Sequence, residues 1–175
     1  MSSNIEQVLE RARNVRLAIF DVDGVMTDGT LYIGADGEAF KAFNILDGHG
    51  VKMLQANGVV AAILSGRSSE AVARRARELS IAHVLQGIDD KMAAFERLLA
   101  GLGIAPAACA FVGDDLPDLA VMKRCGLAVA VANAVESVKS AAHYVTRASG
   151  GRGAVREFCE LVLRAQGRPA GDRTA

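Results

Sequence analysis

Two carboxylates stand two residues apart, at Asp21 and Asp23, directly after an apolar run. That run, residues 17–20, is typical of a buried parallel strand, because an acidic turn containing Gly24 closes it. Open α/β sheets bind their ligands at the carboxyl ends of the strands. Side chains alternate along an extended chain, so Asp21 and Asp23 begin on one face and can divide the roles of nucleophile and proton donor.

Two further polar residues follow predicted strands. Ser65 comes after the apolar residues 59–64 and can donate a hydrogen bond to a phosphate oxygen. Lys91 opens a predicted helix and offers a cation that would keep a neighbouring carboxylate ionised. Taken singly, a Ser-Gly pair is more often a helix-capping turn, and a lysine is more often a solvated surface charge. Their common position at strand ends favours a phosphate site.

A second acidic segment places Asp114, Asp115 and Asp118 after the apolar residues 109–112. Asp114, nearest the strand end, is the candidate metal ligand, whereas Asp115 and Asp118 could equally cap the following helix. Carboxylates about 4 Å apart repel by about 4 kcal/mol per pair at an effective dielectric of 20, so their clustering implies a divalent cation. Oxygen ligands alone favour Mg²⁺ over zinc, because the three histidines are scattered without ligand spacing.

The chain of 175 residues suits a single domain spanning 1–175. Its 20 basic and 20 acidic residues cancel, which argues against a nucleic-acid or membrane-surface partner and favours a small one. No apolar run approaches the roughly 20 residues of a membrane span. Three widely spaced cysteines indicate buried, reduced thiols. We therefore expect a cytoplasmic protein.

Apolar runs and helical patterns alternate along the chain, which predicts an α/β fold with a doubly wound parallel, Rossmann-like sheet. The strands are expected at residues 17–20, 59–64, 82–85, 109–112 and 127–131. The helices are expected at residues 5–13, 51–55, 69–79, 91–102, 116–124 and about 150–165. Residues 167–175 have the composition of a mobile tail.

One segment interrupts this alternation. Residues 30–43 are predicted to form a protruding β-hairpin that turns at Asp36-Gly37. Its edges are available for pairing with another subunit.

In order and spacing, these four motifs resemble the haloacid dehalogenase superfamily of phosphatases. The resemblance implies that Asp21 attacks phosphorus to form an aspartyl-phosphate and that Asp23 acts as acid and then base. It implies Mg²⁺ held by the Asp21 carboxylate, the Asp23 backbone carbonyl and Asp114. Ser65 and Lys91 would then grip the phosphate, and the supporting residues, which orient Lys91 and the metal's waters, would be Asp115 and Asp118.

A narrower resemblance, over residues 15–167, is to the 3-deoxy-D-manno-octulosonate 8-phosphate phosphatase family. It is carried by three stretches, Asp23-Gly24-Val25-Met26-Thr27-Asp28-Gly29, Lys41-Ala42-Phe43-Asn44-Ile45-Leu46-Asp47-Gly48-His49-Gly50 and Gly150-Gly151-Arg152-Gly153-Ala154-Val155-Arg156-Glu157. The resemblance implies a cytoplasmic, Mg²⁺-dependent homotetramer. Its product would be an acidic eight-carbon sugar used to build lipopolysaccharide.

The same resemblance assigns a sugar site. It would be lined by Asn44, Ile45, Leu46, Asp47 and Gly48, with positive charge from Arg67, Arg75 and Lys91. Lys52 stands where this family leads us to expect an arginine. Lysine keeps the positive charge but lacks the planar guanidinium group that binds a carboxylate through two hydrogen bonds.

The gaps between motifs are too short for the cap domain of larger superfamily members. A site open to water would weaken its electrostatic contacts, so we expect a neighbouring subunit as lid. The hairpins are expected to pack in the tetramer core, and residues 150–152 or the tail are expected to reach an adjacent site.

Three alternatives carry other functions. A signalling receiver domain also places acids, a hydroxyl and a lysine at strand ends, but it lacks the second carboxylate at Asp23 and the hairpin. A non-catalytic oligomerisation domain has no reason to keep the acids clustered. A phosphatase for a nine-carbon acidic sugar phosphate is the closest enzymatic alternative.

Overall fold

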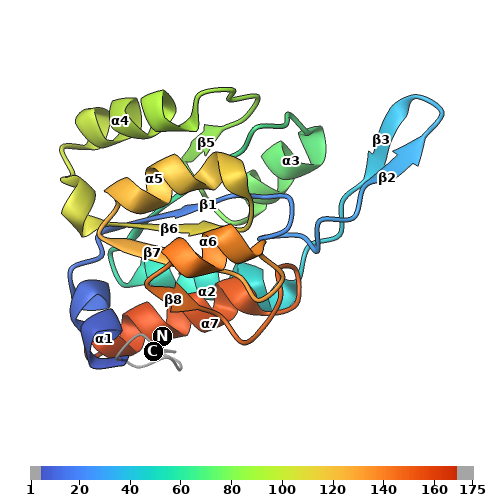
Figure 1. The fold of residues 1–175 in the computed structure, drawn as a ribbon. Helices are drawn as coiled ribbons and strands as arrows, with labels where there is room; N and C mark the ends of the chain where they lie inside the picture. Colours follow the sequence, from blue (N-terminus) through green and yellow to red (C-terminus); the bar gives the residue numbers. More distant parts are fainter. Residues whose placement is uncertain (1–4, 169–175) are drawn as a thin grey trace.

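The central feature of the computed structural model, which describes residues 5–168, is a six-stranded sheet (Figure 1). Its order is β5-β4-β1-β6-β7-β8, and every neighbouring pair is parallel. The predicted doubly wound α/β fold is thereby confirmed. The strands are β1 (Leu17–Phe20), β4 (Val60–Leu64), β5 (His83–Leu85), β6 (Cys109–Gly113), β7 (Leu127–Ala130) and β8 (Tyr144–Val145).

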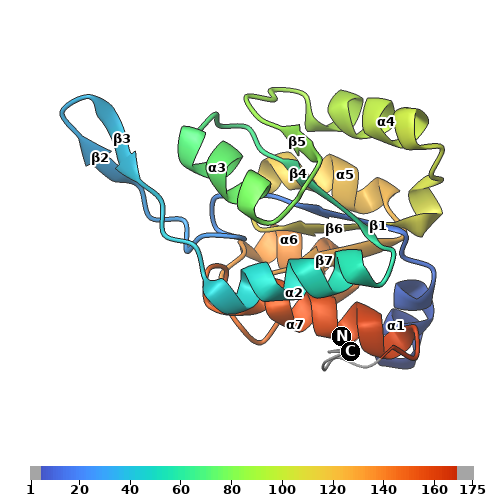
Figure 2. The ribbon, with the colours of Figure 1, turned by 180° about the vertical axis from the view of Figure 1, so that it is seen from behind.

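Helices cover both faces of the sheet (Figures 1 and 2). On one face α7 packs against α1 and α2, and α3 lies beside α2; on the other, α5 packs against α4 and α6. The bounds are α1 (Ile5–Arg13), α2 (Ile45–Ala56), α3 (Glu70–Glu78), α4 (Lys91–Leu102), α5 (Leu119–Arg124), α6 (Glu136–Ala141) and α7 (Ala154–Ala165), with short 3₁₀ turns η1 (Pro106–Ala108) and η2 (Leu116–Asp118).

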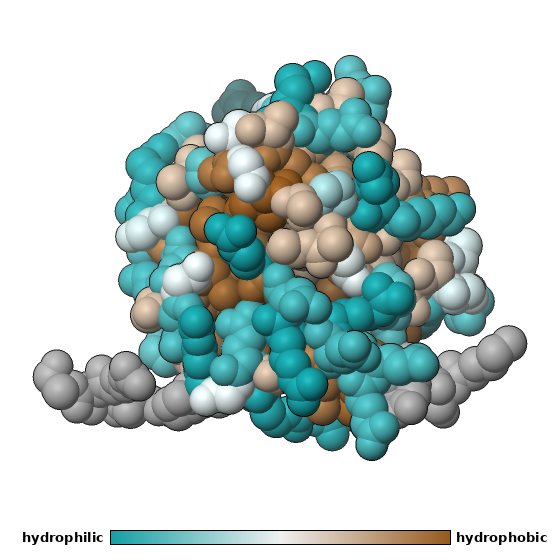
Figure 3. All heavy atoms as spheres, turned by 90° about the vertical axis from the view of Figure 1, so that its left-hand side faces the viewer, coloured by the Kyte–Doolittle hydropathy of each residue, from teal (hydrophilic) through white to brown (hydrophobic). Residues whose placement is uncertain are grey.

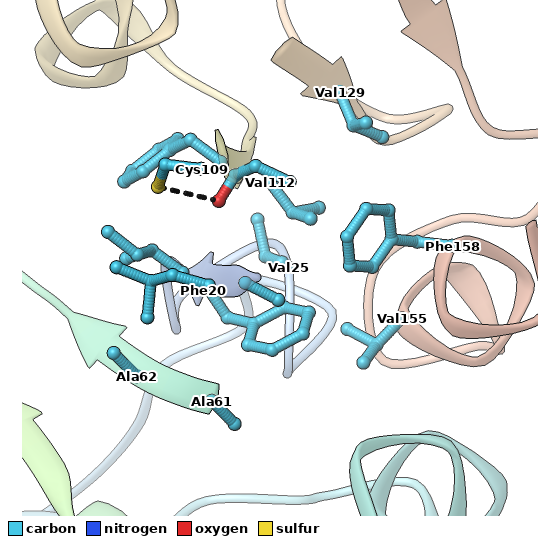
Figure 4. Close-up of a cluster of buried hydrophobic side chains, with 14 of the residues drawn as sticks. Phe20, Val25, Ala61, Ala62, Cys109, Val112, Val129, Val155 and Phe158 are labelled. Carbon is cyan, nitrogen blue, oxygen red and sulfur yellow. Dashed lines mark hydrogen bonds between the residues drawn. The ribbon is translucent and has the colours of Figure 1, made fainter. Parts of the chain in front are cut away.

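The core lies between the sheet and these helices, and all four residues of β1 are fully buried. In Figure 4, Phe20 of β1 faces Phe158 of α7, and their rings meet edge to face with centroids 5.7 Å apart. Such pairs stabilise a core by about 0.5–1.5 kcal/mol beyond simple burial. The three cysteines, Cys109 among them, are buried and unpaired, as predicted. This packing fixes β1, and with it the loop that follows.

The predicted hairpin is present as β2 (Tyr32–Gly34) and β3 (Gly37–Phe40), an antiparallel pair that projects beyond the carboxyl end of β1 (Figure 1). Gly37 adopts a φ of +111°, which a side chain would strain, so the turn falls where the Asp-Gly pair predicts it. Tyr32 and Phe40 stack across the pair with ring centroids 4.3 Å apart.

Several elements differ from expectation. Helix α2 is not confined to residues 51–55 but begins at Ile45, because the Asn44 side chain caps it by accepting hydrogen bonds from the N–H groups of Leu46 (2.8 Å) and Asp47 (3.3 Å). The first turn of the predicted helix at residues 116–124 is the separate 3₁₀ turn η2. The short elements α6 and β8 were not predicted.

Asp47 joins α2 to α7. Its side chain is buried, with 2% exposed, and its carboxylate accepts hydrogen bonds from the backbone N–H of Gly153 (3.3 Å) and Arg156 (2.8 Å). Gly153 has no capping side chain of its own, so a residue of another helix supplies the acceptor for the start of α7. A side chain at Gly50 would lie 3.1 Å from the Arg156 Cα, so this glycine lets the helices approach.

The end of the molecule away from the hairpin has a different surface. In Figure 3, hydrophilic residues cover most of this face and hydrophobic residues gather toward its upper part. An apolar depression of about 410 Å³ lies at the end of α4, with Leu99 and Ile104 in its lining. Within residues 5–168, no helix combines the length and apolar character needed to cross a membrane.

We predict that Asp47→Ala lowers the free energy of unfolding by about 1–3 kcal/mol, because it leaves buried N–H groups at the start of α7 without an acceptor. Urea denaturation followed by circular dichroism measures the loss. Asp36→Ala, at the exposed hairpin turn, is the matched control and should leave the midpoint unchanged. An Asp47→Ala midpoint equal to that of the unsubstituted chain would contradict the capping role.

Candidate active site

The ends of three adjacent strands meet the start of α4 around one cavity of about 350 Å³. β1 lies between β4 and β6, so the residues that follow these strands emerge together at one edge of the sheet. The structure brings together the catalytic and metal set expected from the sequence. The cavity is lined by Asp21, Asp23, Ser65, Gly66, Arg67, Ile88, Asp89, Lys91, Asp114, Asp115, Pro117 and Asp118.

A buried ammonium group organises this cavity. Lys91, 7% exposed, donates hydrogen bonds from Nζ to Oδ1 of Asp21 at 2.8 Å and to Oδ1 of Asp118 at 2.7 Å. Burial lowers the pKa of Lys91, but the two carboxylates outweigh it and leave that pKa above its ordinary value. Lys91 is therefore a permanent cation at the site.

Asp118 acts as a scaffold. It is 1% exposed, and its second oxygen, Oδ2, accepts the N–H groups of Asp114 (2.9 Å) and Asp115 (3.3 Å). Both oxygens are thus occupied by protein donors, so Asp118 orients Lys91 and shapes the turn. No hydrogen bond or ion pair joins Asp115 to Lys91 within residues 5–168; Oδ1 of Asp115 accepts the Leu116 N–H at 2.8 Å and caps η2.

Asp114 carries a carboxylate that lacks a cationic hydrogen-bond partner among residues 5–168. Oxygens of Asp21, Asp114 and Asp118 lie within 4.8 Å of one another. Burial, reinforced by the charges of Asp21 and Asp118, raises the pKa of Asp114 to about 7; burial, opposed by Lys91, raises the pKa of Asp21 to about 6. Such oxygens fit a hard divalent cation, which would supply the missing positive charge.

Glycine backbone surrounds these acids. Gly24 has a φ of +89°, and a Cβ there would lie 2.0 Å from Oδ2 of Asp114. A Cβ at Gly150 would lie 1.8 Å from the Gly24 carbonyl oxygen, so the two loops touch backbone to backbone. Asn133 ties them together: its Nδ2 donates to Gly24 O at 3.0 Å, and its Oδ1 accepts the Gly150 N–H at 2.7 Å.

Ser65, Asp23 and Arg67, which were also predicted as site residues, line the same cavity. Ser65 is 3% exposed, and its hydroxyl has no hydrogen-bond partner within residues 5–168, which leaves it free for a ligand. Asp23 lies at the mouth of the cavity, where Arg67 Nε is 3.6 Å from its Oδ2. Arg67 is half-exposed and can also reach an anion in the cavity.

Seven residues of the expected sugar site do not line this cavity. Asn44 and Asp47 serve as helix caps, and Gly48 is buried against Arg75, whose Nη1 lies 3.2 Å from Glu78 Oε2. The other three, Ile45, Leu46 and Lys52, are exposed on α2.

The segment at Gly150 to Arg152, expected to reach an adjacent site, packs against this chain's own loop at residues 24–28. Of the predicted mobile tail at residues 167–175, the part from residue 169 onward lies outside the described residues.

Sequence reasoning missed Lys41. Its Nζ donates a hydrogen bond to Oδ1 of Asp23 across 18 positions of sequence. No spacing rule connects the two residues, because their contact depends on the path of the hairpin.

A larger depression of about 520 Å³ lies between β8 and α7. Its carboxylates already have partners: Glu157 accepts the Tyr144 hydroxyl at 2.6 Å, and Glu160 pairs with Arg156 at 2.6 Å. The first bond joins β8 to α7 and the second lies within α7, so both carboxylates serve the local structure and the strand-end cavity is the candidate active site.

The close sequence relatives of this chain include two named phosphatases. The chain is 49% identical over 166 residues to the 3-deoxy-D-manno-octulosonate 8-phosphate phosphatase KdsC of Yersinia pestis, covering 95% of this chain and 89% of that protein. It is 49% identical over 161 residues to KdsC of Escherichia coli K12, covering 92% and 86%. A family profile for haloacid dehalogenase-like hydrolases matches residues 83–158.

The fold is shared as well. A crystal structure of 3-deoxy-D-manno-octulosonate 8-phosphate phosphatase from Moraxella catarrhalis, in complex with a magnesium ion, a phosphate ion and a KDO molecule, superposes with a TM-score of 0.90 at 42% identity, covering 93% of each chain. Identity at this level over nearly the whole length shows that the chain belongs to the 3-deoxy-D-manno-octulosonate 8-phosphate phosphatase family of haloacid dehalogenase-like hydrolases.

Proposed function

We propose that this protein is a Mg²⁺-dependent phosphatase that hydrolyses 3-deoxy-D-manno-octulosonate 8-phosphate to the free sugar acid and phosphate, in the supply of lipopolysaccharide precursors in the cytoplasm. The observation that carries the proposal is the buried Lys91–Asp21 pair at 2.8 Å, with Asp114 beside it and an open cavity in front. The magnesium, phosphate and KDO bound to the Moraxella catarrhalis relative support the substrate and the metal.

The first half-reaction uses Asp21 and Asp23. Lys91 holds Oδ1 of Asp21, which leaves the other carboxylate oxygen of Asp21, Oδ2, to attack phosphorus. The bond from phosphorus to the sugar oxygen breaks as the aspartyl-phosphate forms. Asp23 gives its proton to the departing sugar oxygen, and Ser65 and Lys91 bind the phosphoryl oxygens.

In the second half-reaction the same groups act again, with Asp23 now accepting a proton instead of donating one. Asp23, now ionised, takes a proton from a water molecule, whose oxygen attacks phosphorus and releases Asp21. Phosphate leaves, and Asp23 has regained its proton. Asp118 contributes indirectly, because its buried carboxylate keeps Lys91 in position through both steps.

The metal is assigned to the Asp21 and Asp114 carboxylates and the Asp23 backbone carbonyl. Asp118 lies within the same cluster, but its two oxygens already accept hydrogen bonds from Lys91 and backbone N–H groups, which supports a role beside the metal rather than on it. When bound, Mg²⁺ offsets the charge of the carboxylates and of the transferring phosphoryl group.

The active unit is assigned as a single capless domain within a homotetramer, with sites at subunit interfaces. Apolar side chains on and beside the hairpin support this assembly. Ile33 is 65% exposed, Phe40 55%, Ile45 79% and Leu46 57%. Another copy of the chain would cover these side chains and, in the same contact, bring part of α2 to the cavity mouth.

The direct test is a phosphate-release screen with Mg²⁺ across acidic eight- and nine-carbon sugar phosphates and simple hexose phosphates. We expect the eight-carbon acid to give the highest kcat/KM. A preference for the nine-carbon acid would change the substrate and keep the chemistry. No phosphate release from any ester would overturn the function.

We predict that Asp21→Asn reduces phosphate release to background, because the neutral amide cannot attack phosphorus. Circular dichroism should show that the fold is retained, since the two side chains have nearly the same volume. Asp36→Asn in the hairpin turn is the matched control and should keep full activity. Turnover by the Asp21→Asn variant would contradict the covalent mechanism.

The raised pKa values predict pH-dependent metal binding. Asp21 and Asp114 have pKa values of about 6 and about 7 in the folded, metal-free chain, above the ordinary 3.8, so the folded state binds more protons than the unfolded state between these limits. Stability of the metal-free protein therefore falls as pH rises from roughly 4 to 7. Protons compete with Mg²⁺, so binding should be roughly tenfold weaker at pH 5.5 than at pH 7.5.

Thermal denaturation with and without Mg²⁺ at the two pH values measures this effect. The rise in Tm caused by Mg²⁺ should be clearly larger at pH 7.5. In Asp114→Asn the rise should nearly vanish at both. If Mg²⁺ raised the Tm of the unsubstituted chain equally at pH 5.5 and pH 7.5, Asp21 and Asp114 would not be the metal ligands.

A further inference from the structure

The side chain of Lys41 is buried although the residue stands at the base of an exposed hairpin. Its side chain is 2% exposed, whereas Phe40, the preceding residue, is 55% exposed. A buried ammonium group needs charged or hydrogen-bonding partners to offset its lost hydration. Lys41 has two: it donates to Oδ1 of Asp23 and lies 3.0 Å from Oε2 of Glu38.

These contacts belong to a ring of four charges that joins three segments of the chain. Arg67, after β4, lies 3.6 Å from Asp23 Oδ2 and 3.7 Å from Glu38 Oε2. Ser69 donates a hydrogen bond from Oγ to Oε1 of Glu38 at 2.5 Å. This bond attaches the ring to a residue outside the hairpin. Lys41 and Glu38 come from the hairpin, so the ring ties the hairpin to the loops that carry Asp23 and Arg67.

The two cations of this ring contribute unequally. The Arg67 side chain is 48% exposed and its contacts exceed 3.5 Å, so solvent weakens its hold on Asp23. Lys41 is excluded from solvent and makes a direct hydrogen bond. Of the two, Lys41 is therefore the residue that fixes the orientation of the Asp23 carboxylate.

Orientation matters at Asp23 because a proton is transferred only within about 2.6–3.2 Å of its acceptor. With Oδ1 of Asp23 held by Lys41, Oδ2 is the oxygen that can carry the proton toward the cavity. We propose that Lys41, supported by Glu38, is a positioning residue that aims the Asp23 carboxyl group at the leaving oxygen, and so makes the hairpin part of the catalytic apparatus. This inference rests on the proposed function, in which Asp23 is the general acid.

The proposal predicts a loss that depends on the leaving group. A sugar alkoxide needs a proton as it departs, whereas p-nitrophenolate is stable without one. Lys41→Met should therefore lower kcat/KM for the sugar phosphate by about 10²-fold, the usual weight of general acid catalysis, and change kcat/KM for p-nitrophenyl phosphate by less than about threefold. kcat/KM reports steps through aspartyl-phosphate formation, so the second half-reaction does not enter.

Three comparisons make the test specific. Lys123→Met, at an exposed lysine of α5, should leave both substrates unaffected. Asp23→Asn should show the same selective loss as Lys41→Met. The double variant should lose no more than Asp23→Asn alone, because Lys41 acts through Asp23.

An equal loss on both substrates, or no loss on either, would overturn the positioning role. An additive loss in the double variant would also overturn it. If Lys41→Met does not fold, Glu38→Gln, which removes the charge that supports Lys41, replaces it, and an unchanged ratio of the two substrates then counts against the proposal. If Asp23→Asn itself shows no selective loss, the assignment of the general acid fails instead, and the two failures are distinguishable.

Discussion

The site depends on one buried cation held between two buried carboxylates. Lys91 joins Asp21, which follows β1, to Asp118, which ends η2, and neither acid would be stable in this position without it. Asp118 in turn uses its other oxygen to hold the backbone of Asp114. A single ammonium group thus helps to set the position of Asp21, the proposed nucleophile, and of the loop that bears Asp114, the proposed metal ligand. The remaining carboxylate, Asp114, lacks a cationic hydrogen-bond partner within residues 5–168, and in the proposed function a metal ion balances its charge.

The sheet order explains why these groups meet. β1 occupies the centre, with β4 on one side and β6 on the other. The strand after β4, β5, continues toward one edge of the sheet, and the strands after β6 continue toward the other. The crevice at such a reversal is where open α/β sheets bind ligands. Asp21 and Asp23, the proposed nucleophile and general acid, follow β1; Ser65 follows β4, and Asp114, the proposed metal ligand, follows β6. α4 follows β5 and begins with Lys91, which lines the same cavity.

Much of this could be predicted from the sequence, because the governing signals are local. Apolar runs ending in polar residues predicted the sheet and the cavity lining, and the Asp36-Gly37 pair predicted the hairpin turn. The resemblance to the phosphatase family is confirmed by relatives that match almost the entire chain.

The parts that could not be predicted depend on contacts between distant residues. Asp47 was assigned to the sugar site, yet its partners are backbone N–H groups 106 and 109 positions away. Lys41 reaches Asp23 only through the course of the hairpin. Gly48 and Gly50 have low helix propensity, so the sequence around them did not predict a helix. The Asn44 cap nevertheless starts α2 at Ile45.

The backbone contact between Gly24 and Gly150 has a consequence for the thermodynamics of substrate recognition. A loop that is locked by glycine packing and by both ends of the Asn133 amide has little conformational entropy left to lose. Capture of a phosphate ester therefore does not require this segment to become ordered, and more of the interaction energy remains as net affinity. Substitutions in this segment should be poorly tolerated, because a single methyl group at residue 150 would push apart the two loops beside the cavity.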